Sequence, residues 1–287
     1  MLNLVLSILF SSLIFVIFKL FSIYKIQTLY AIITNYVVAC TVGLFLYQGP
    51  IAISSVPQKP WFFGTLALGL LFILVFNLMA ATAQKVGVSV ASVATKMSFV
   101  IPVIIGVIAY QEHLSILKIV GILLAIAAVY FASMKESKAS FNIKILLLPI
   151  LVFLGSGSID ATIKYFQEKH VNPTEFSLFS SVVFGSAAII GILFIVLQSK
   201  KKPLKINFRN IIGGVVLGVP NFFSIYFLLK ALNNPNFNSA SIFTINNVAI
   251  VMFSTLLGIL LFKEKISTKN WFGIALAIIS ISLVALT

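Results

Sequence analysis

The chain has 287 residues, of which 60% are hydrophobic and only 9% are charged, and its mean hydropathy is +1.14. A soluble globular domain has about 25% charged residues, so the composition excludes one. The net charge of +14 would favour a nucleic-acid partner in a soluble chain, but here the basic residues lie mainly between apolar blocks. In such positions they orient a membrane protein and contact anionic lipid headgroups. We therefore expect a lipid bilayer, and not nucleic acid, as the partner.

An apolar segment of about 20 residues is long enough to span a bilayer as a helix. In chain order there are ten such segments: 2–18, 27–48, 61–83, 87–110, 116–134, 145–163, 174–197, 211–230, 239–262 and 270–286. The first has no basic residues before it and no small-residue cleavage site after it, so we interpret it as a retained span and not as a signal peptide. The apolar runs are continuous and do not alternate as barrel strands do. The sequence predicts an all-α, polytopic membrane protein with ten transmembrane helices.

The two halves of the chain are similar to each other. At an offset of 152 residues, the fourth and fifth segments recur in the ninth and tenth, pairing Ser89 with Ser241, Gly106 with Gly258, Glu112 with Glu264, Ser115 with Ser267 and Gly121 with Gly273. A weaker offset of 145 pairs Ser11 with Ser156 and Lys19 with Lys164. Because each copy has an odd number of spans, the copies must insert in opposite orientations, a design associated with alternating-access transporters. We predict a first five-helix repeat over 1–134, a linker over 135–144 and a second repeat over 145–287.

These repeated residues resemble the drug/metabolite transporter superfamily, specifically its EamA type. The resemblance lies in a fourth segment that carries Ala91 to Thr95 and Pro102, followed by Glu112-His113-Leu114-Ser115 and Gly121, with a second copy at Asn238 to Ser241, Lys263 to Ser267 and Gly273. It covers the whole chain and implies ten helices around a central cavity, with the fifth and tenth at the periphery. It does not identify a substrate, since this superfamily carries amino acids, other metabolites, nucleotide sugars and drugs. Ser254 stands where the first copy has Pro102, so a kink in the fourth span need not recur in the ninth.

The basic residues predict an orientation. Fourteen lie in connections 1–2, 3–4, 5–6, 7–8 and 9–10, whereas five lie in the even connections, namely Lys59, Lys118, Lys164, Lys169 and Lys230. The positive-inside rule then puts the odd connections in the cytoplasm and both termini outside a cell membrane, either an inner or a plasma membrane. Eukaryotic relatives are usually drawn with both termini in the cytosol, so the opposite orientation stays open.

A polar residue inside an apolar span is costly unless it faces a cavity or a partner, so such residues mark candidate sites. Lys96 lies about ten residues into the fourth segment, near the membrane midplane at 1.5 Å per residue, with Ser92 one turn earlier and Thr95 beside it. We interpret Lys96 as a cavity ammonium that binds a substrate carboxylate or releases a proton during transport. The structural alternative is a lysine that extends to the nearer interface or pairs with a carboxylate.

Asp160 follows the glycine- and serine-rich stretch 155–158 in the sixth segment, where Ser158 is a further candidate. Such residues loosen a helix and open its backbone to ions or substrate. Asp160 has two candidate partners, Lys96 across a cavity and Lys164 one turn further along the same helix.

The ninth segment contributes polar residues at depths that match those of the fourth, pairing Thr244 with Ser92, Asn246 with Ala94 and Asn247 with Thr95. Two inverted copies that present polar groups at equivalent depths are what a midplane site requires. Asn77, Asn221 and Tyr226 are further candidates, and each has an interhelical hydrogen bond as its alternative role. For Glu112 and Glu264, which lie at span ends, we expect a structural role in capping or bracing a helix.

Three classes of function remain. A secondary transporter that exports a small polar metabolite, such as an amino acid, is favoured by the inverted repeat and by the absence of a nucleotide-binding loop. A membrane-embedded lipid-modifying enzyme would use paired carboxylates or a metal cluster, but the six acidic residues and two histidines are scattered. The third class is a channel or a non-transporting receptor, and a channel would be expected to show a carbonyl or charged-ring filter, usually built by oligomeric symmetry. We therefore expect a transporter and not an enzyme, acting as a monomer or homodimer, with protons as a further candidate partner and with no cofactor or metal.

Overall fold

The structure is a computed structural model that describes residues 2–49, 52–110, 115–134, 143–172, 175–199, 207–232 and 239–285. Within these ranges the chain forms α-helices and one short 3₁₀ helix, and no strand. The helices are α1 (Leu2–Ile23), α2 (Thr28–Phe45), η1 (Ile53–Gln58), α3 (Phe62–Lys85), α4 (Val88–Met97), α5 (Val100–Tyr110), α6 (Ile116–Ser133), α7 (Ile143–Lys169), α8 (Phe176–Ser199), α9 (Phe208–Leu232), α10 (Ser239–Phe262) and α11 (Thr268–Ala285). The predicted all-α class is confirmed.

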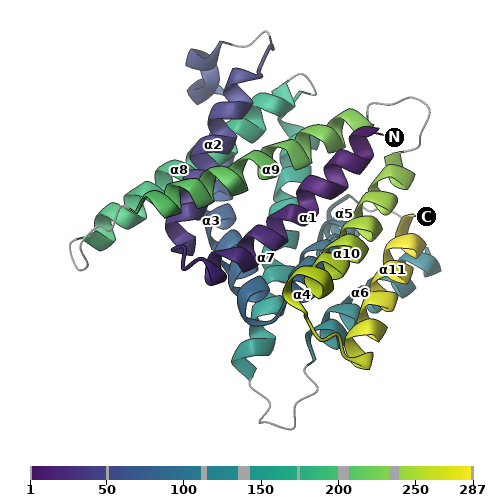
Figure 1. Ribbon diagram of the computed structural model, residues 1–287. Helices are drawn as coiled ribbons and strands as arrows, with labels where there is room; N and C mark the ends of the chain where they lie inside the picture. The colour runs from purple at the N-terminus through teal and green to yellow at the C-terminus, as the bar shows by residue number, and fades with distance from the viewer. Residues whose placement is uncertain are drawn as a thin grey trace.

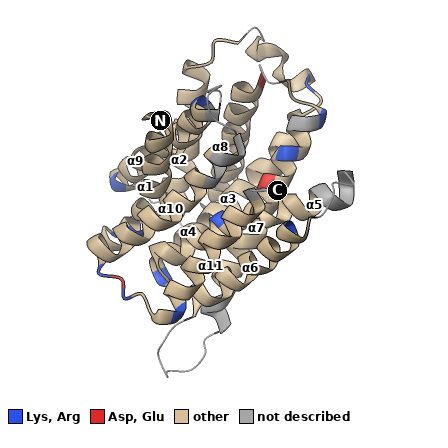
Figure 2. Ribbon diagram, turned by 90° about the vertical axis from the view of Figure 1, so that its right-hand side faces the viewer, with Lys and Arg blue, Asp and Glu red and all other residues tan. Residues whose placement is uncertain are grey.

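The ten predicted spans are confirmed as helical segments. In the described part of the chain, nine segments are long and apolar enough to cross a membrane, and the tenth, Thr268–Val284, is slightly shorter. One of the nine, Val88–Ile105, joins α4 to the start of α5. Figure 2 shows most of the basic positions, in blue, toward the two ends of the bundle. The predicted linker 135–144 lies outside the described residues except at its last two positions, which begin α7.

The fourth span is broken between α4 and α5, at Ser98 and Phe99. Pro102 has no N–H to donate to the carbonyl of Ser98, four residues earlier, and that carbonyl instead accepts a bond from the Ile101 amide at 2.9 Å. The Ser98 hydroxyl adds a second distortion, because it donates to the Thr95 carbonyl at 2.6 Å. The corresponding helix of the second repeat, α10, is continuous. The break in the fourth span is therefore not repeated in the ninth, where the sequence has Ser254 and no proline.

The contacts between helices follow the inverted repeat. α1 packs on α9 and α10, and its counterpart α7 packs on α3, α4 and α5. In the same way α2 packs on α9, and its counterpart α8 packs on α3. Among the described residues, three pairs of counterparts contact each other directly: α2 with α8, α4 with α10, and α6 with α11. Figure 1 shows α6 and α11 side by side at one edge of the bundle, which confirms their peripheral position.

Small residues allow α6 and α11 to approach closely. A Cβ added to Gly121 would lie against Val284, and one added to Gly273 would lie against the Ala132 backbone. The Ser280 hydroxyl donates to the Gly121 carbonyl at 2.7 Å across this interface. In a membrane, where lipid tails are as apolar as the helix surface, such close packing and interhelical hydrogen bonds drive association. The repeated glycines therefore hold the fifth and tenth spans together.

Glu175 ties two connections together at the end of the bundle where α3 and α8 begin. Its carboxylate accepts hydrogen bonds from Lys59 Nζ and Trp61 Nε1, each at 2.9 Å. Burial raises the pKa of Glu175, but the hydrogen bonds from Trp61 and Lys59 and the Lys59 charge outweigh burial and hold that pKa below its ordinary value. The carboxylate is therefore charged at neutral pH, and it braces this end.

Candidate functional site

A cavity of about 540 Å³ lies where the two repeats meet. Helices of both repeats line it, namely α1, α3, α4, α5, α7, α9 and α10. Its apolar walls include Phe15, Phe72, Phe76 and Phe99, and its polar lining consists of Ser11, Thr95, Lys96, Ser156, Asp160, Lys164, Asn221, Ser224, Asn246 and Asn247. The volume and the mixture of apolar walls with a few polar groups are typical of a small-molecule site.

Lys96 and Asp160 come to this cavity from different repeats. Lys96 lies in the last turn of α4, directly before the break, and Asp160 lies on α7. The Ser98 hydroxyl, which donates to the Thr95 carbonyl, also lies 3.3 Å from Asp160 Oδ2 and so connects the break to α7. The charges of Lys96 and Asp160 act on each other. Among the described side chains, however, the direct ion pairs are Lys19 with Glu264 and Lys59 with Glu175. Lys96 and Asp160 thus line the cavity as a cation and an anion that do not form a direct ion pair with each other.

Asn246 and Asn247 are neighbours on α10 with different surroundings. Asn246 is 1% exposed, and its Oδ1 accepts a hydrogen bond from the Ser7 hydroxyl at 3.1 Å. Ser7 is also 3.0 Å from the Ser224 carbonyl, so α1, α9 and α10 meet at this serine. In the described part of the structure, no hydrogen bond joins the Asn247 amide to another residue. Asn247 is therefore available to a ligand, whereas Asn246 also serves packing.

Sequence reasoning missed Ser7, because it is one of three serines in the apolar first segment and nothing in the sequence distinguishes it. It singled out Ser11 and Ser156 only as repeat partners, and both line the cavity. The Ser156 hydroxyl is buried and has no hydrogen-bond partner within the described residues. This hydroxyl is a second neutral group that could bind a ligand.

The other predicted residues have varied positions. Thr95 lines the cavity while its hydroxyl donates to the Ala91 carbonyl, and Asn221 lines it while its amide donates to Asn35 Oδ1 at 3.1 Å. Four further predicted residues with described side chains do not line the cavity. Three of them donate to a carbonyl of their own helix, namely Ser92 to Ser89, Asn77 to Ile73 and Ser158 to Leu154. The fourth, Tyr226, stacks on Phe222, and the Lys230 ammonium lies over its ring. The side chain of Thr244 lies outside the described residues.

Glu264 braces the end of the bundle opposite to Lys164. Its Oε1 accepts from the Val88 amide at 2.8 Å, its Oε2 lies 3.4 Å from the Ser89 hydroxyl, and Lys19 Nζ is 3.9 Å away. Val88 is the first residue of α4, and a carboxylate at a helix N-terminus is stabilised by the partial positive charge there. Ends of α1, α4 and α10 are thus joined. Glu112, the repeat counterpart of Glu264, lies outside the described residues.

Comparison with known proteins gives one family and the same fold. The sequence matches the EamA-like transporter family over residues 1–134 and 143–286. A Haemophilus influenzae protein, described as an uncharacterized protein, is 31% identical over 288 residues, which cover 97% of this chain and 96% of that one. A protein with a crystal structure is similar over 99% of this chain and 96% of its own, with a TM-score of 0.57. At 14% identity, that likeness shows the fold alone.

Proposed function

Because this chain belongs to the EamA-like transporter family, we propose that it is a secondary transporter that exports a small polar metabolite, an amino acid or a related compound, across the cell membrane. The observation that carries the proposal is that Lys96 and Asp160 line one cavity without forming a direct ion pair. In this proposal Lys96 binds the substrate carboxylate and Asp160 binds its ammonium group. Charge-assisted hydrogen bonds of this kind are the strong ones.

The rest of the lining supports the same substrate class. Asn247 and Ser156 offer neutral hydrogen-bonding groups that are not paired with other described residues. Phe15, Phe76 and Phe99 offer apolar surface for a side chain. A zwitterion with an apolar or aromatic side chain satisfies both parts of this lining, whereas a sugar phosphate would leave the carboxylate of Asp160 facing a second anion.

Transport would proceed by alternating access, with the halves 1–134 and 145–287 rocking about the cavity. The Glu264 contacts hold the helix ends together on one side, whereas the lining reaches Lys164 and Leu228 toward the other. We assign this arrangement to the state that is closed on the Glu264 side. Opening that side would require Glu264 to leave the start of α4. Asp160 is the candidate proton-binding group if transport is coupled to protons.

Ligand binding tests the proposed substrate class. A ligand that binds only the folded state raises the apparent unfolding temperature, so purified protein is screened with leucine, phenylalanine and other amino acids. Each is compared with the amine that lacks the carboxylate and with the acid that lacks the ammonium group. We expect at least one amino acid to stabilise the protein and both of its singly charged analogues to fail. Equal stabilisation by a singly charged analogue, or none by any amino acid, would contradict the two-point site.

The orientation is tested by labelling single cysteines. We propose that the odd connections lie in the cytoplasm, from the basic residues, 14 against 5. In a Cys40→Ser background, Ser199→Cys should react with an impermeant maleimide only after the cells are permeabilised. Ser54→Cys, an exposed position in the second connection, should react in intact cells. The reverse pattern would place both termini in the cytoplasm.

A further inference from the structure

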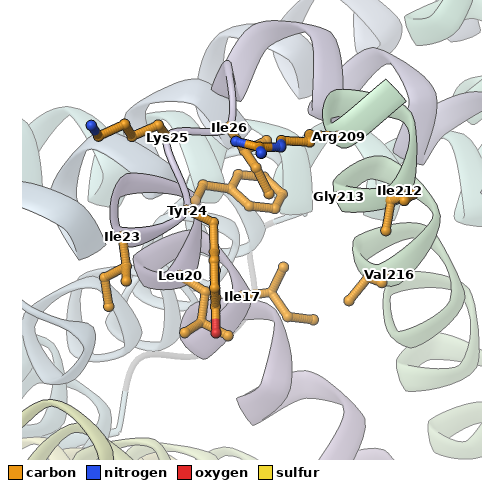
Figure 3. Close-up of a pocket in the computed structure, with 11 residues that line it drawn as sticks. Ile17, Leu20, Ile23, Tyr24, Lys25, Ile26, Arg209, Ile212, Gly213 and Val216 are labelled. Carbon is orange, nitrogen blue, oxygen red and sulfur yellow. The ribbon is translucent and has the colours of Figure 1, made fainter. Parts of the chain in front are cut away.

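A second hollow, separate from the central cavity, lies on the outer surface between α1 and α9. It is a groove of about 710 Å³, and its walls include Ile17, Leu20, Ile23, Ile212 and Val216. Ile23, Ile212 and Val216 are each about half exposed, with fractions of 55%, 47% and 49%. Figure 3 shows these aliphatic side chains below Lys25 and Arg209, so the groove is apolar along its length and basic at one end.

The two basic residues have no carboxylate partner among the described side chains. Of the six acidic residues in the chain, three have described side chains, and these are placed elsewhere: Asp160 at the cavity, Glu175 with Lys59 and Glu264 with Lys19. Arg209 extends from α9 toward the loop between α1 and α2, as Figure 3 shows. Lys25 lies on that loop. The basic end of the groove therefore lacks a counter-charge from the described part of the protein.

Hydrogen bonds next to Lys25 and Arg209 hold both residues at this end of the groove. The backbone N–H of Gln27 donates to Asn210 Oδ1 at 2.9 Å, and the side-chain amide of Asn210 donates to Gln27 Oε1 at 3.1 Å. This pair joins the chain next to Lys25 to the chain next to Arg209. Lys25 has a φ of 53°, a left-handed conformation in the turn that ends α1. That conformation is unusual for a lysine, and it places the residue at the mouth of the groove.

We propose that this groove binds an anionic phospholipid, whose phosphate contacts Lys25 and Arg209 and whose acyl chain lies along the aliphatic wall. A basic pocket at the end of transmembrane helices, with an apolar wall below it, matches a lipid headgroup and its chain. Tyr24, which is 63% exposed and lines the groove, adds an aromatic ring with a polar tip, of the kind enriched at membrane interfaces. A water-soluble phosphate would use the charges but leave the apolar wall unoccupied.

The position of the groove agrees with the orientation that we propose above. Lys25 and Arg209 belong to the first and seventh connections, which that orientation puts in the cytoplasm. The cytoplasmic leaflet carries the anionic lipids that attract basic residues next to spans. Lys200, Lys201, Lys202 and Lys205 precede Arg209 in the sequence and add charge to the same connection.

Native mass spectrometry of the purified full chain tests this site, with phosphatidylglycerol and phosphatidylcholine of identical acyl chains as probes. We expect the wild type to retain phosphatidylglycerol more tightly. The double variant Lys25→Asn, Arg209→Gln removes both charges, and asparagine tolerates the left-handed conformation. Each basic residue near a membrane surface contributes about fivefold to binding, so the double variant should bind phosphatidylglycerol about thirtyfold more weakly. Its retention of phosphatidylcholine should not change.

Matched controls separate this groove from general charge attraction. The double variant Lys263→Asn, Lys269→Gln removes two basic residues from connection 9–10, on the same side of the membrane, and Lys263 also has a φ of 53°. It should retain phosphatidylglycerol as the wild type does. Val216→Trp fills the groove and should weaken retention, whereas Val215→Trp, next to it on α9 and also exposed, should not.

Three results would overturn the proposal. The first is equal retention of the two lipids by the wild type. The second is equal loss of phosphatidylglycerol in the two double variants, which would indicate general electrostatic attraction. The third is displacement of phosphatidylglycerol by glycerol 1-phosphate, which would indicate a site for a water-soluble anion and not for a lipid. If one double variant fails to fold, the comparison of Val216→Trp with Val215→Trp decides between the groove and the rest of the surface.

Discussion

Lys96→Met is expected to abolish transport while leaving the fold intact. Methionine keeps most of the length and apolar bulk of lysine but removes the ammonium group that we assign to the substrate carboxylate. Truncating one partner of a buried charged pair costs about 2–5 kcal/mol, so substrate binding should weaken by at least about thirtyfold. The unfolding temperature should stay the same or rise, because a charge inside a span is itself costly.

The measurement is substrate uptake into proteoliposomes as a function of pH. Lys96→Arg should restore little activity, because a guanidinium group is larger, binds in a fixed planar geometry and does not release its proton at physiological pH. Lys118→Met, which removes a lysine from α6 outside the cavity lining, is the control and should transport normally. Wild-type rates and an unchanged pH profile in Lys96→Met would reduce Lys96 to a structural lysine. The coupling group would then have to be sought at Asp160.

Asn247→Leu should impair transport strongly and stability only slightly, whereas Asn246→Leu should do the reverse. Asn246 accepts a hydrogen bond from Ser7 at 3.1 Å and is almost fully buried. Replacing it leaves the Ser7 hydroxyl with one partner fewer and cuts a link between α1 and α10. Asn247 lines the cavity and has no such partner among the described residues. Losing one hydrogen bond to a charged ligand costs about 1.5–3 kcal/mol, so binding should weaken by roughly ten- to a hundredfold.

Thermal unfolding and transport are measured together on the two asparagine variants, which differ by one position on the same helix. The informative quantity is transport per folded molecule. If Asn247→Leu lowers the unfolding temperature while its surviving fraction transports at the wild-type rate, Asn247 is a structural hydrogen-bonding residue. The pairing of Asn247 with Thr95 in the repeat would then no longer support a site with ligand-binding groups from both repeats at this depth.

Helical spans could be predicted from the sequence because each is a long, nearly uninterrupted apolar run, such as 239–262, which the structure reproduces as α10. The inverted repeat could be predicted because Gly121 and Gly273 serve the same close contact between α6 and α11.

The break after Met97 was only partly predictable. Pro102 pointed to a kink, but the additional hydrogen bonds of Ser98 to Thr95 and Asp160 depend on how α4 packs on α7.

Candidate site residues could be predicted only where a charged group inside an apolar span costs much free energy. Lys96 and Asp160 stood out as charges in apolar spans, and both line the cavity. Ser92, Asn77 and Ser158 stood out less clearly, because such side chains can donate to a carbonyl of their own helix and need no cavity. Helical periodicity shows which residues share a face, but the neighbouring helices decide which face is turned inward. The groove between α1 and α9 could not be predicted, since it arises where two distant segments meet at Gln27 and Asn210.

The central claim, that the cavity carries a substrate by alternating access, is tested most directly by counterflow in proteoliposomes. Vesicles are loaded with the unlabelled amino acid that stabilises the protein and then diluted into a trace of the same labelled compound. Alternating access predicts that labelled substrate accumulates transiently above its external concentration, and that internal substrate accelerates its entry. Entry at the same rate into loaded and empty vesicles would indicate a channel, and conversion of the substrate would indicate an enzyme. Either result would contradict the account.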